Sequence, residues 1–339
     1  MKAKLEPRIY LKNRPVLKDV VPLETPFIIN VDPSDVCNLR CNFCPTGDLS
    51  LMRNTAGRMH GPMKFSLFQK IIGDICGFPK PLKVLRLYKD GEPLVNPKFA
   101  EMVHYAKKSG CAEIIDTTTN ATLLDHKRST EIIEAGLDRL NISIYGVNSE
   151  QYRSFCHKQI AFETLVENLT FFYQNRGQCK MMLKINGDFL SDSERANFFE
   201  VFGDICDGIS IEHVAECWPG FDFRSKSISA NPDLGIYGQP IEEVLVCPYI
   251  FYSFSINSSG VASACFLDWN RKLIIGDATR ENVVDIWEGS SLTSLQKMML
   301  RGERKSHPVC VNCDQLRRGK PDNIDIYRET LLEKLEALR

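Results

Sequence analysis

Two kinds of apolar pattern alternate along residues 27–213. Short runs rich in β-branched and aromatic residues predict six strands, over 27–32, 83–88, 112–119, 139–145, 181–186 and 208–213. Apolar residues at helical spacing predict the intervening helices, over 65–75, 97–109, 126–135, 161–175 and 191–202. Six strand–helix units in series favour a parallel sheet. No Gly-x-Gly-x-x-Gly follows the first strand, so we predict an α/β fold with a partial (β/α)6 barrel of the TIM type rather than a dinucleotide-binding fold.

The rest of the chain predicts a second, smaller unit. Residues 214–243 are rich in Gly, Pro, Ser and Asn and predict a linker. Residues 244–267 carry no formal charge, but the Asn-Ser-Ser-Gly at 257–260 divides them, so we predict a β-hairpin rather than a membrane span. Residues 285–302 predict a helix. A final helix has one apolar face that we expect to pack on the body, formed by Ile324, Tyr327, Leu331, Leu335 and Leu338. The expected divisions are an N-terminal extension (1–26), the barrel (27–213), the linker (214–243), an auxiliary domain (244–320) and a C-terminal helix (321–339).

Composition narrows the possible partners. The chain has 339 residues, of which 43% are hydrophobic and 25% charged, with a net charge of −1, as in a soluble globular protein. A nucleic-acid-binding surface needs an excess of Lys and Arg, so we expect no nucleic acid partner. No apolar run follows the basic N-terminal residues, so we expect no signal peptide, no membrane partner and a cytoplasmic location. In a reducing cytoplasm, the 13 cysteines indicate metal binding or catalysis rather than disulfides.

Three cysteines directly follow the first predicted strand. Cys37, Cys41 and Cys44 stand in the pattern Cys-x3-Cys-x2-Cys, with the aromatic Phe43 before the last of them. Three thiolates can bind three irons of a [4Fe–4S] cluster and leave the fourth iron open to another ligand. Spacing alone does not exclude structural zinc, which also uses cysteines a few residues apart. On the first strand–helix loop, this motif resembles the signature of the radical S-adenosylmethionine (SAM) superfamily.

The resemblance implies a reaction and its cofactors. Members of the family coordinate SAM to the open iron and cleave it reductively to a 5′-deoxyadenosyl radical, which abstracts a hydrogen atom from the substrate. SAM is therefore an implied cofactor, and a flavodoxin- or ferredoxin-type protein is the implied electron donor. The turn after the second strand, Gly91-Glu92-Pro93, resembles the family's contact with the SAM amino group. It departs from the usual Gly-Gly-Glu, because Asp90 precedes Gly91.

Three further positions resemble family contacts and follow the later strands. Asn120 resembles a lining residue of the SAM site, Ser143 is similar to a ribose or carboxylate contact, and Arg153 is similar to a carboxylate clamp. Taken singly, they would be interpreted as a helix cap, a small strand residue and a solvated charge. Their places at successive strand ends behind the cysteine motif favour the functional interpretation.

A second set of cysteines stands in the C-terminal region and comprises Cys247, Cys265, Cys310 and Cys313. Four thiolates can saturate a second [4Fe–4S] cluster or a zinc ion. The order of Cys-Phe-Leu-Asp, Asp-Ile-Trp and a closing Cys-x2-Cys resembles the twitch or SPASM auxiliary-cluster domain of the superfamily. The likeness extends to its aminocyclitol dehydrogenases and to sulfatase-maturing and peptide-modifying members.

Candidate catalytic residues follow the sixth predicted strand. Cys217 would face the barrel mouth, where in some epimerases of the family a cysteine returns a hydrogen atom to the substrate; an inert thiol is the alternative. Glu216 and His213 could accept a proton from the substrate, although a lone histidine is more often a core residue.

These features together predict a radical SAM oxidoreductase that oxidises a secondary alcohol of a small polar substrate, such as a sugar or an aminocyclitol. After hydrogen abstraction from a carbinol carbon, a ketone forms by loss of one proton and one electron, and a fully ligated auxiliary cluster can accept the electron. The alternatives are a peptide-modifying enzyme, a redox-neutral epimerase that uses Cys217, and a non-enzyme with structural zinc or a sensing iron–sulfur cluster.

Overall fold

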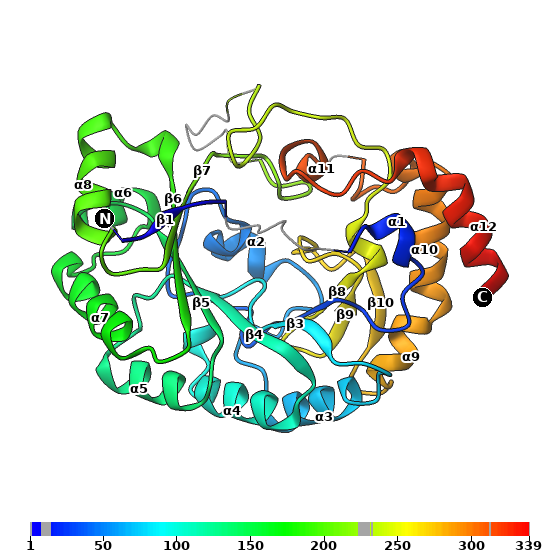
Figure 1. The fold of residues 1–339 in the computed structure, drawn as a ribbon, viewed down its shortest axis with the longest axis horizontal. Helices are drawn as coiled ribbons and strands as arrows, with labels where there is room; N and C mark the ends of the chain where they lie inside the picture. Colours follow the sequence, from blue (N-terminus) through cyan, green and yellow to red (C-terminus); the bar gives the residue numbers. More distant parts are fainter. Residues whose placement is uncertain (1, 8–14, 223–230, 232, 312, 339) are drawn as a thin grey trace.

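The structure is a computed structural model of residues 1–339 and describes all of them except 1, 8–14, 223–230, 232, 312 and 339. Within the described residues, one sheet of ten strands has the order β1-β7-β6-β5-β4-β3-β2-β8-β9-β10. The sheet is curved, and helices cover its outer side (Figure 1). The strands are β1 (Lys4–Leu5), β2 (Ile28–Val31), β3 (Leu82–Arg86), β4 (Ala112–Thr119), β5 (Arg139–Ile144), β6 (Lys180–Asn186), β7 (Gly208–Glu212), β8 (Ser253–Ile256), β9 (Val261–Ser263) and β10 (Ile274–Asp277).

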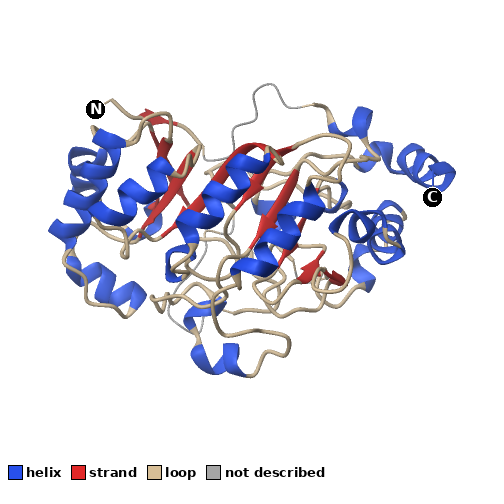
Figure 2. Cartoon of the chain, turned by 90° about the horizontal axis from the view of Figure 1, so that it is seen from below, coloured by secondary structure: helices blue, strands red, loops and turns tan. Residues whose placement is uncertain are grey.

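The predicted barrel elements are confirmed. The six strands β2 to β7 pair in parallel, and every predicted strand or helix boundary lies within two residues of its observed position. A row of helices lies across the outer face of these strands (Figure 2). The barrel helices are α3 (Phe65–Ile75), α4 (Phe99–Ser109), α5 (His126–Glu134), α6 (Ser149–Cys156), α7 (Phe162–Asn175) and α8 (Asp192–Phe202).

Side chains alternate between the two faces of the barrel strands. On β5, Leu140 and Ile142 are buried in the apolar core, whereas Arg139, Asn141 and Ser143 line a central cavity. This alternation follows from the two-residue period of a strand. The apolar side chains pack against the helices, and the polar side chains face the interior of the barrel.

The sheet extends beyond the predicted barrel at both edges. The short strand β1 pairs in parallel with β7. At the other edge, β8 pairs in parallel with β2, so the first strand of the auxiliary region continues the barrel sheet. The chain then turns at residues 257–260, and β9 returns antiparallel to β8, which confirms the predicted hairpin.

The C-terminal region is helical. The predicted helix over 285–302 is divided at Gly289, where the backbone becomes extended, into α9 (Val283–Glu288) and α10 (Ser290–Leu300). The last helix, α12 (Arg328–Leu338), packs beside α10. Ile324, Leu331 and Leu335 are buried, which confirms that this face packs on the body.

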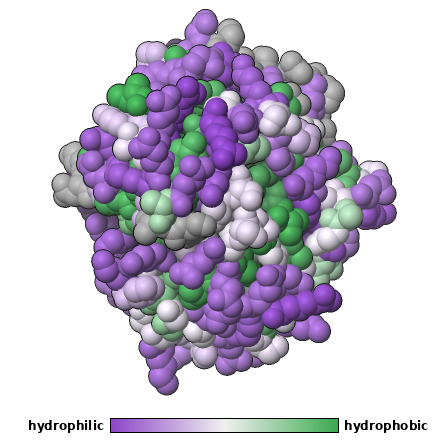
Figure 3. Space-filling view, turned by 90° about the vertical axis from the view of Figure 1, so that its right-hand side faces the viewer, coloured by the Kyte–Doolittle hydropathy of each residue, from purple (hydrophilic) through white to green (hydrophobic). Residues whose placement is uncertain are grey.

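The surface is polar on the side of α9, α10 and α12, where hydrophobic residues are seen mainly in furrows between hydrophilic ones (Figure 3). Among the described residues, no helix combines the length and the apolar character that crossing a membrane requires. The predicted linker over 214–243 lies partly outside the described residues, at 223–230 and 232. Four shorter segments complete the elements used below: α1 (Leu17–Val20), α2 (Leu49–Arg53), α11 (Gln315–Arg318) and the 3₁₀ helix η2 (Pro93–Val95).

Candidate functional site

A cavity of about 640 Å³ occupies the centre of the barrel. The three thiols of the cysteine loop (residues 37–44) line this interior cavity, together with inward-facing residues of β2 to β7. Cavities of several hundred Å³ are typical of small-molecule sites. Of the residues that the resemblance connects with SAM, five line it: Phe43, Gly91, Glu92, Asn120 and Ser143.

Close backbone packing holds the cysteine loop in place. A Cβ atom on Gly91 would lie 2.2 Å from the carbonyl oxygen of Ser34 and 2.3 Å from that of Val36. A Cβ atom on Gly47 would lie 2.3 Å from the carbonyl oxygen of Cys41. Only glycine permits these approaches. Sequence analysis identified Gly91 but missed Gly47, although a glycine three residues after the motif could have indicated a tight turn.

The thiols of the cysteine loop have raised pKa values. Burial raises the pKa of Cys44 to about 11 and also raises the pKa of Cys37. The pKa of Cys41 is raised mainly by contact with the buried thiol of Cys156, at 3.5 Å between the sulfur atoms, and then by burial. Metal ions bind the thiolate and displace these protons. Three thiols that share one loop and form no disulfide fit the ligand set of an iron–sulfur cluster with an open iron.

Glu92 is held in place by three hydrogen bonds. Its carboxylate accepts hydrogen bonds from Thr119 Oγ1 at 2.5 Å, from the backbone N–H of Asn120 at 2.8 Å and from that of Leu94 at 3.0 Å. Burial raises the pKa of Glu92, and these hydrogen bonds oppose the shift. Glu92 thus ties the turn after β3 to the end of β4 and also lines the interior cavity, and its contact with the SAM amino group stays a prediction.

Asn120 connects the end of β4 to the cysteine loop. Its Nδ2 donates a hydrogen bond to Asn38 Oδ1 at 2.9 Å and lies 3.7 Å from Cys37 Sγ. Its Oδ1 accepts from the backbone N–H of Thr122 at 2.9 Å. The side chain therefore both lines the interior cavity and positions the loop. Asn38, which takes part in this contact, was not singled out from the sequence.

The remaining expected SAM contacts differ in their placement. Phe43 stacks on Phe189 with ring centroids 5.9 Å apart, and Ser143 lines the cavity at the end of β5. Pro93 is buried at the start of η2 and does not line the interior cavity. Arg153 lies outside the cavity lining, with a side chain that is 65% exposed and lies 3.7 Å from Glu150 on the same helix face, so the structure does not bring it together with the other expected SAM contacts.

Asp90, the departure from Gly-Gly-Glu, is the centre of a buried ionic cluster. Its carboxylate lies 2.6 Å from Arg271 Nη1, 2.8 Å from Lys89 Nζ and 3.5 Å from Arg58 Nη1. Burial favours the neutral form, but the three cations outweigh it and hold the pKa of Asp90 at about 2. We call this group the Asp90 cluster (Asp90, Arg58, Lys89 and Arg271).

The Asp90 cluster also reaches the second cysteine set. Arg58 donates to the carbonyl of Trp269 at 3.0 Å, and Lys89 donates to the carbonyl of Asp268 at 3.1 Å. These two residues follow Cys265 closely in the chain. The turn that packs on the cysteine loop is thus connected by charged side chains to the segment behind an auxiliary thiol.

The candidate catalytic residues lie around the end of β7. His213 lines the interior cavity, and its Nδ1 lies 2.7 Å from Asp188 Oδ1. Cys217 also lines the cavity, and burial, with the nearby Cys313 thiol as the next cause, raises its pKa to about 12. Glu216 is absent from the described lining of this cavity. The structure therefore places two of the three candidates, His213 and Cys217, in the lining of the interior cavity.

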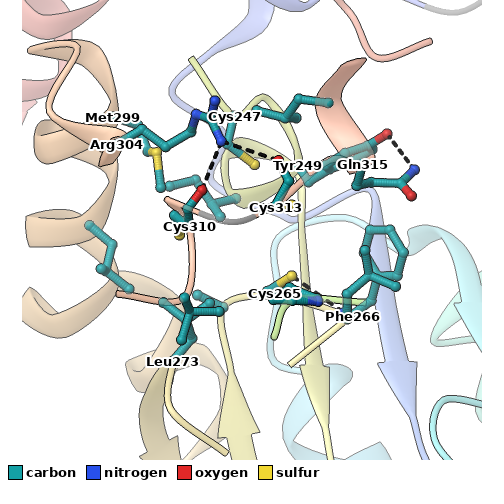
Figure 4. A pocket seen from close by; sticks show the side chains of 17 residues that line it. Cys247, Tyr249, Cys265, Phe266, Leu273, Met299, Arg304, Cys310, Cys313 and Gln315 are labelled. Carbon is teal, nitrogen blue, oxygen red and sulfur yellow. Dashed lines mark hydrogen bonds between the residues drawn. The ribbon is translucent and has the colours of Figure 1, made fainter. Parts of the chain in front are cut away.

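The second cysteine set surrounds a separate small cavity (Figure 4). Its lining includes Cys247, Cys265, Cys310 and Cys313. Burial raises the pKa values of Cys247 and Cys310 to about 12, and the thiol of Cys313 adds to both shifts. Arg304, which sequence analysis missed, is buried beside them and donates to the carbonyl of Cys310 at 2.9 Å. Four thiols around one cavity with a buried cation fit a fully ligated cluster.

The two cavities share a wall. Tyr249, Phe266, Leu267 and Gln315 line both the interior cavity and the cavity of the second cysteine set. In Figure 4, Phe266 and Gln315 lie beside the thiols of Cys265 and Cys313. A single layer of side chains thus separates the interior cavity from the thiols of the second cysteine set.

Family models match both parts of the chain. The radical SAM superfamily matches residues 31–197, and the SPASM iron–sulfur cluster-binding domain matches residues 247–314. A tungsten-containing aldehyde ferredoxin oxidoreductase cofactor-modifying protein of Pyrococcus furiosus is 36% identical over 108 residues, 32% of this chain and 28% of the relative. The SAM-dependent 2-deoxy-scyllo-inosamine dehydrogenase of Niallia circulans is 35% identical over 52 residues, 15% of this chain and 21% of the relative. These alignments span about a third or less of the relatives' own length.

Solved structures share the fold. BtrN in complex with AdoMet and 2-DOIA has a TM-score of 0.55 at 17% identity and covers 85% of this chain and 92% of its own. Streptococcus suis SuiB bound to S-adenosylmethionine has a TM-score of 0.60 at 16% identity and covers 89% of this chain and 74% of its own. At such identities the likeness concerns the fold alone. The family models, together with the two thiol sets, identify the chain as a radical SAM protein with a C-terminal SPASM domain, and hence as one that uses iron–sulfur clusters and SAM.

Proposed function

We propose that this radical SAM enzyme is an oxidoreductase that oxidises a secondary alcohol of a small hydroxylated substrate, such as a sugar or an aminocyclitol. The shared wall between the two cavities carries the proposal. A substrate in the interior cavity would be one side-chain layer from the auxiliary thiols, where an electron acceptor is needed.

Different parts of the chain hold the two clusters and the substrate in the proposed reaction. When bound, the SAM-binding cluster and SAM supply a 5′-deoxyadenosyl radical, and the auxiliary cluster supplies an electron acceptor. The cysteine loop holds the first cluster, with Gly91, Glu92 and Asn120 fixing the position of the loop. The four thiols of the second set hold the other cluster behind the shared wall. The barrel excludes bulk water and orients the C–H bond that reacts.

Oxidation of an alcohol also needs a proton acceptor, and we propose His213. The Asp188 carboxylate at 2.7 Å from Nδ1 favours the tautomer with the proton on that nitrogen. Nε2 then carries the lone pair that accepts the hydroxyl proton of the substrate. Asp188 acts as a positioning residue, because it also accepts a hydrogen bond from the backbone of Val214 at 2.7 Å.

A specific observation favours epimerisation as the second candidate function. Cys217 lines the interior cavity, and its raised pKa of about 12 keeps the thiol protonated at neutral pH. A hydrogen-atom donor must carry its S–H hydrogen, so this environment suits the role. In that reaction no electron would leave the substrate, and the auxiliary cluster would not serve as the acceptor.

Product mass distinguishes the two functions. Cluster-loaded enzyme, a reductant, SAM and candidate sugars or aminocyclitols are incubated in D₂O, and the products are analysed by mass spectrometry. We expect a product two hydrogens lighter that is lost in His213→Gln and retained in Cys217→Ala. Cys76→Ala is the matched control, because Cys76 lies outside both cavity linings. A product that gains one solvent deuterium and depends on Cys217 would overturn oxidation in favour of epimerisation.

A further inference from the structure

Arg304 is a buried cation that forms no ion pair. Three arginines are buried in the described part of the chain, namely Arg58, Arg304 and Arg318. Arg58 approaches the carboxylate of Asp90, and Arg318 pairs with Asp314. Arg304 is 7% exposed, but no carboxylate of the described residues pairs with it. A buried charge without a counter-ion is unfavourable, so this position favours an anion that the side chains do not supply.

Backbone contacts hold Arg304 at the second cysteine set. Arg304 begins the 3₁₀ helix η6 (Arg304–Ser306), which follows α10. Its Nε donates a hydrogen bond to the carbonyl of Leu245 at 3.2 Å. Its Nη1 donates to the carbonyl of Cys310 at 2.9 Å and to that of Cys313 at 3.5 Å (Figure 4). The guanidinium group is therefore fixed beside two of the four thiol-bearing residues.

The charge of the guanidinium group is not balanced by these contacts. All of its hydrogen bonds go to neutral backbone carbonyls, and its side chain lines the cavity of the second cysteine set. The carboxylate of Asp268, which follows Cys265 in the chain, is engaged elsewhere. It accepts hydrogen bonds from Ser263 Oγ at 2.6 Å and from the backbone N–H groups of Lys272 and Leu273, each at 2.9 Å. The positive charge is thus directed at the group that fills the cavity.

A [4Fe–4S] cluster with four thiolate ligands is such an anion, because the thiolates carry more negative charge than the iron–sulfur core carries positive charge. The same cavity is lined by Arg304 and by the four thiols, those of Cys247, Cys265, Cys310 and Cys313. We propose that Arg304 is the counter-charge of the auxiliary cluster and raises its reduction potential. It touches no substrate and acts through the cluster, as a positioning residue.

The sign of the effect follows from electrostatics. Reduction of the cluster adds one negative charge, and a fixed cation in a poorly solvated interior stabilises that charge. In the proposed oxidation, the substrate radical loses one electron and its hydroxyl proton passes to His213. The auxiliary cluster gains that electron, so a higher potential favours the transfer. This use of the charge rests on the proposed function, whereas the assignment of Arg304 as counter-charge does not.

Redox titration of the cluster-loaded, full-length protein tests the charge without any substrate. The reduced auxiliary cluster is followed by electron paramagnetic resonance, and its signal is the one that persists when the three cysteines of the cysteine loop are replaced by alanine. At the wild-type midpoint potential, Arg304→Gln should lower the ratio of reduced to oxidised auxiliary cluster at least about tenfold. This corresponds to a midpoint lower by about 59 mV for a one-electron couple.

Two variants separate charge from contacts. Arg304→Lys retains the charge and should shift the midpoint less than Arg304→Gln does. Arg301→Gln is the matched control, because it removes an exposed arginine that pairs with Glu336 on the same side of the molecule, and its midpoint should equal that of the wild type. A smaller change than tenfold in Arg304→Gln, or an equal shift in Arg304→Lys, would overturn the proposal.

Iron content decides the case in which Arg304→Gln does not retain the auxiliary cluster. About four auxiliary irons in Arg304→Lys would then support the requirement for a charge, and their loss from both variants would count against it. The proposed function is tested separately by product mass. A lower potential in Arg304→Gln, together with a wild-type product that is not two hydrogens lighter, would retain the counter-charge and exclude the oxidation.

Discussion

Replacing Asp90 by asparagine tests the ionic cluster that joins the two cysteine sites. Arg58, Lys89 and Arg271 are at most 4% exposed and all approach its carboxylate. Breaking a buried ion pair by removing one partner costs about 3–5 kcal/mol, because the remaining charge stays buried. For Asp90→Asn we expect a loss in this range, which corresponds to a melting temperature lower by roughly 4–7 °C for a chain of this size.

The measurement is thermal unfolding of the cluster-loaded protein under anaerobic conditions, followed by circular dichroism. Asp19→Asn is the matched control, since its ion pair with Lys18 is exposed and should contribute less than about 1 kcal/mol. The double variant of Asp90→Asn with Arg271→Met should lose about 0.5–3 kcal/mol less than the sum of the single losses, because the two groups are in direct contact. Additive losses of stability in the double variant, or a loss below about 1 kcal/mol in Asp90→Asn, would refute this account of the Asp90 cluster.

Three further predictions address the sites. Replacing all three cysteines of the cysteine loop by alanine should abolish 5′-deoxyadenosine formation and leave about four irons bound, measured by chromatography and iron assay; residual SAM cleavage would contradict the ligand assignment. Gly91→Ala should impair SAM binding in equilibrium dialysis, whereas Gly61→Ala, with no atom within 4 Å of the added methyl, should not. Burial and the Asp90 charge raise the pKa of Asp32 to about 8, so the folded state retains a proton that the unfolded state loses near pH 4. As the pH rises from about 4 to about 8, the free energy of unfolding of the wild type should fall, relative to that of Asp32→Asn, by up to about 1.4 kcal/mol per pH unit. A difference between the two proteins that does not change with pH would contradict this prediction.

The barrel could be predicted because its strands have one apolar face. On β5, the residues at alternate positions pack under the helices, so hydrophobic periodicity located the strand within one residue. The pairing of β1 with β7 and of β8 with β2 could not be predicted. Two-residue β1 has too few side chains for a pattern, and its place depends on hydrogen bonds to a strand about 200 residues away.

The cysteine loop could be predicted because its spacing is local, and the second cysteine set because the order of its motifs resembles a known domain. The roles of single polar residues could not be predicted. Sequence shows that Glu92 and Arg153 carry charge, but not what competes for that charge. Thr119 and the backbone N–H of Asn120 donate hydrogen bonds to the Glu92 carboxylate. Arg153 lies on the exposed face of α6 beside Glu150. Both outcomes depend on neighbours that only the folded chain brings together.

Asp90 shows what a departure from a family motif can mean. A buried carboxylate in place of glycine at this turn would be unfavourable alone, because burial opposes its charge. Its three cations come from separate parts of the chain, and Arg271 belongs to the auxiliary region. A carboxylate at position 90 therefore depends on Arg58 and Arg271, which lie 32 and 181 positions away along the chain. The turn that packs on the cysteine loop and the loop behind Cys265 are therefore held together by the contacts of this one carboxylate.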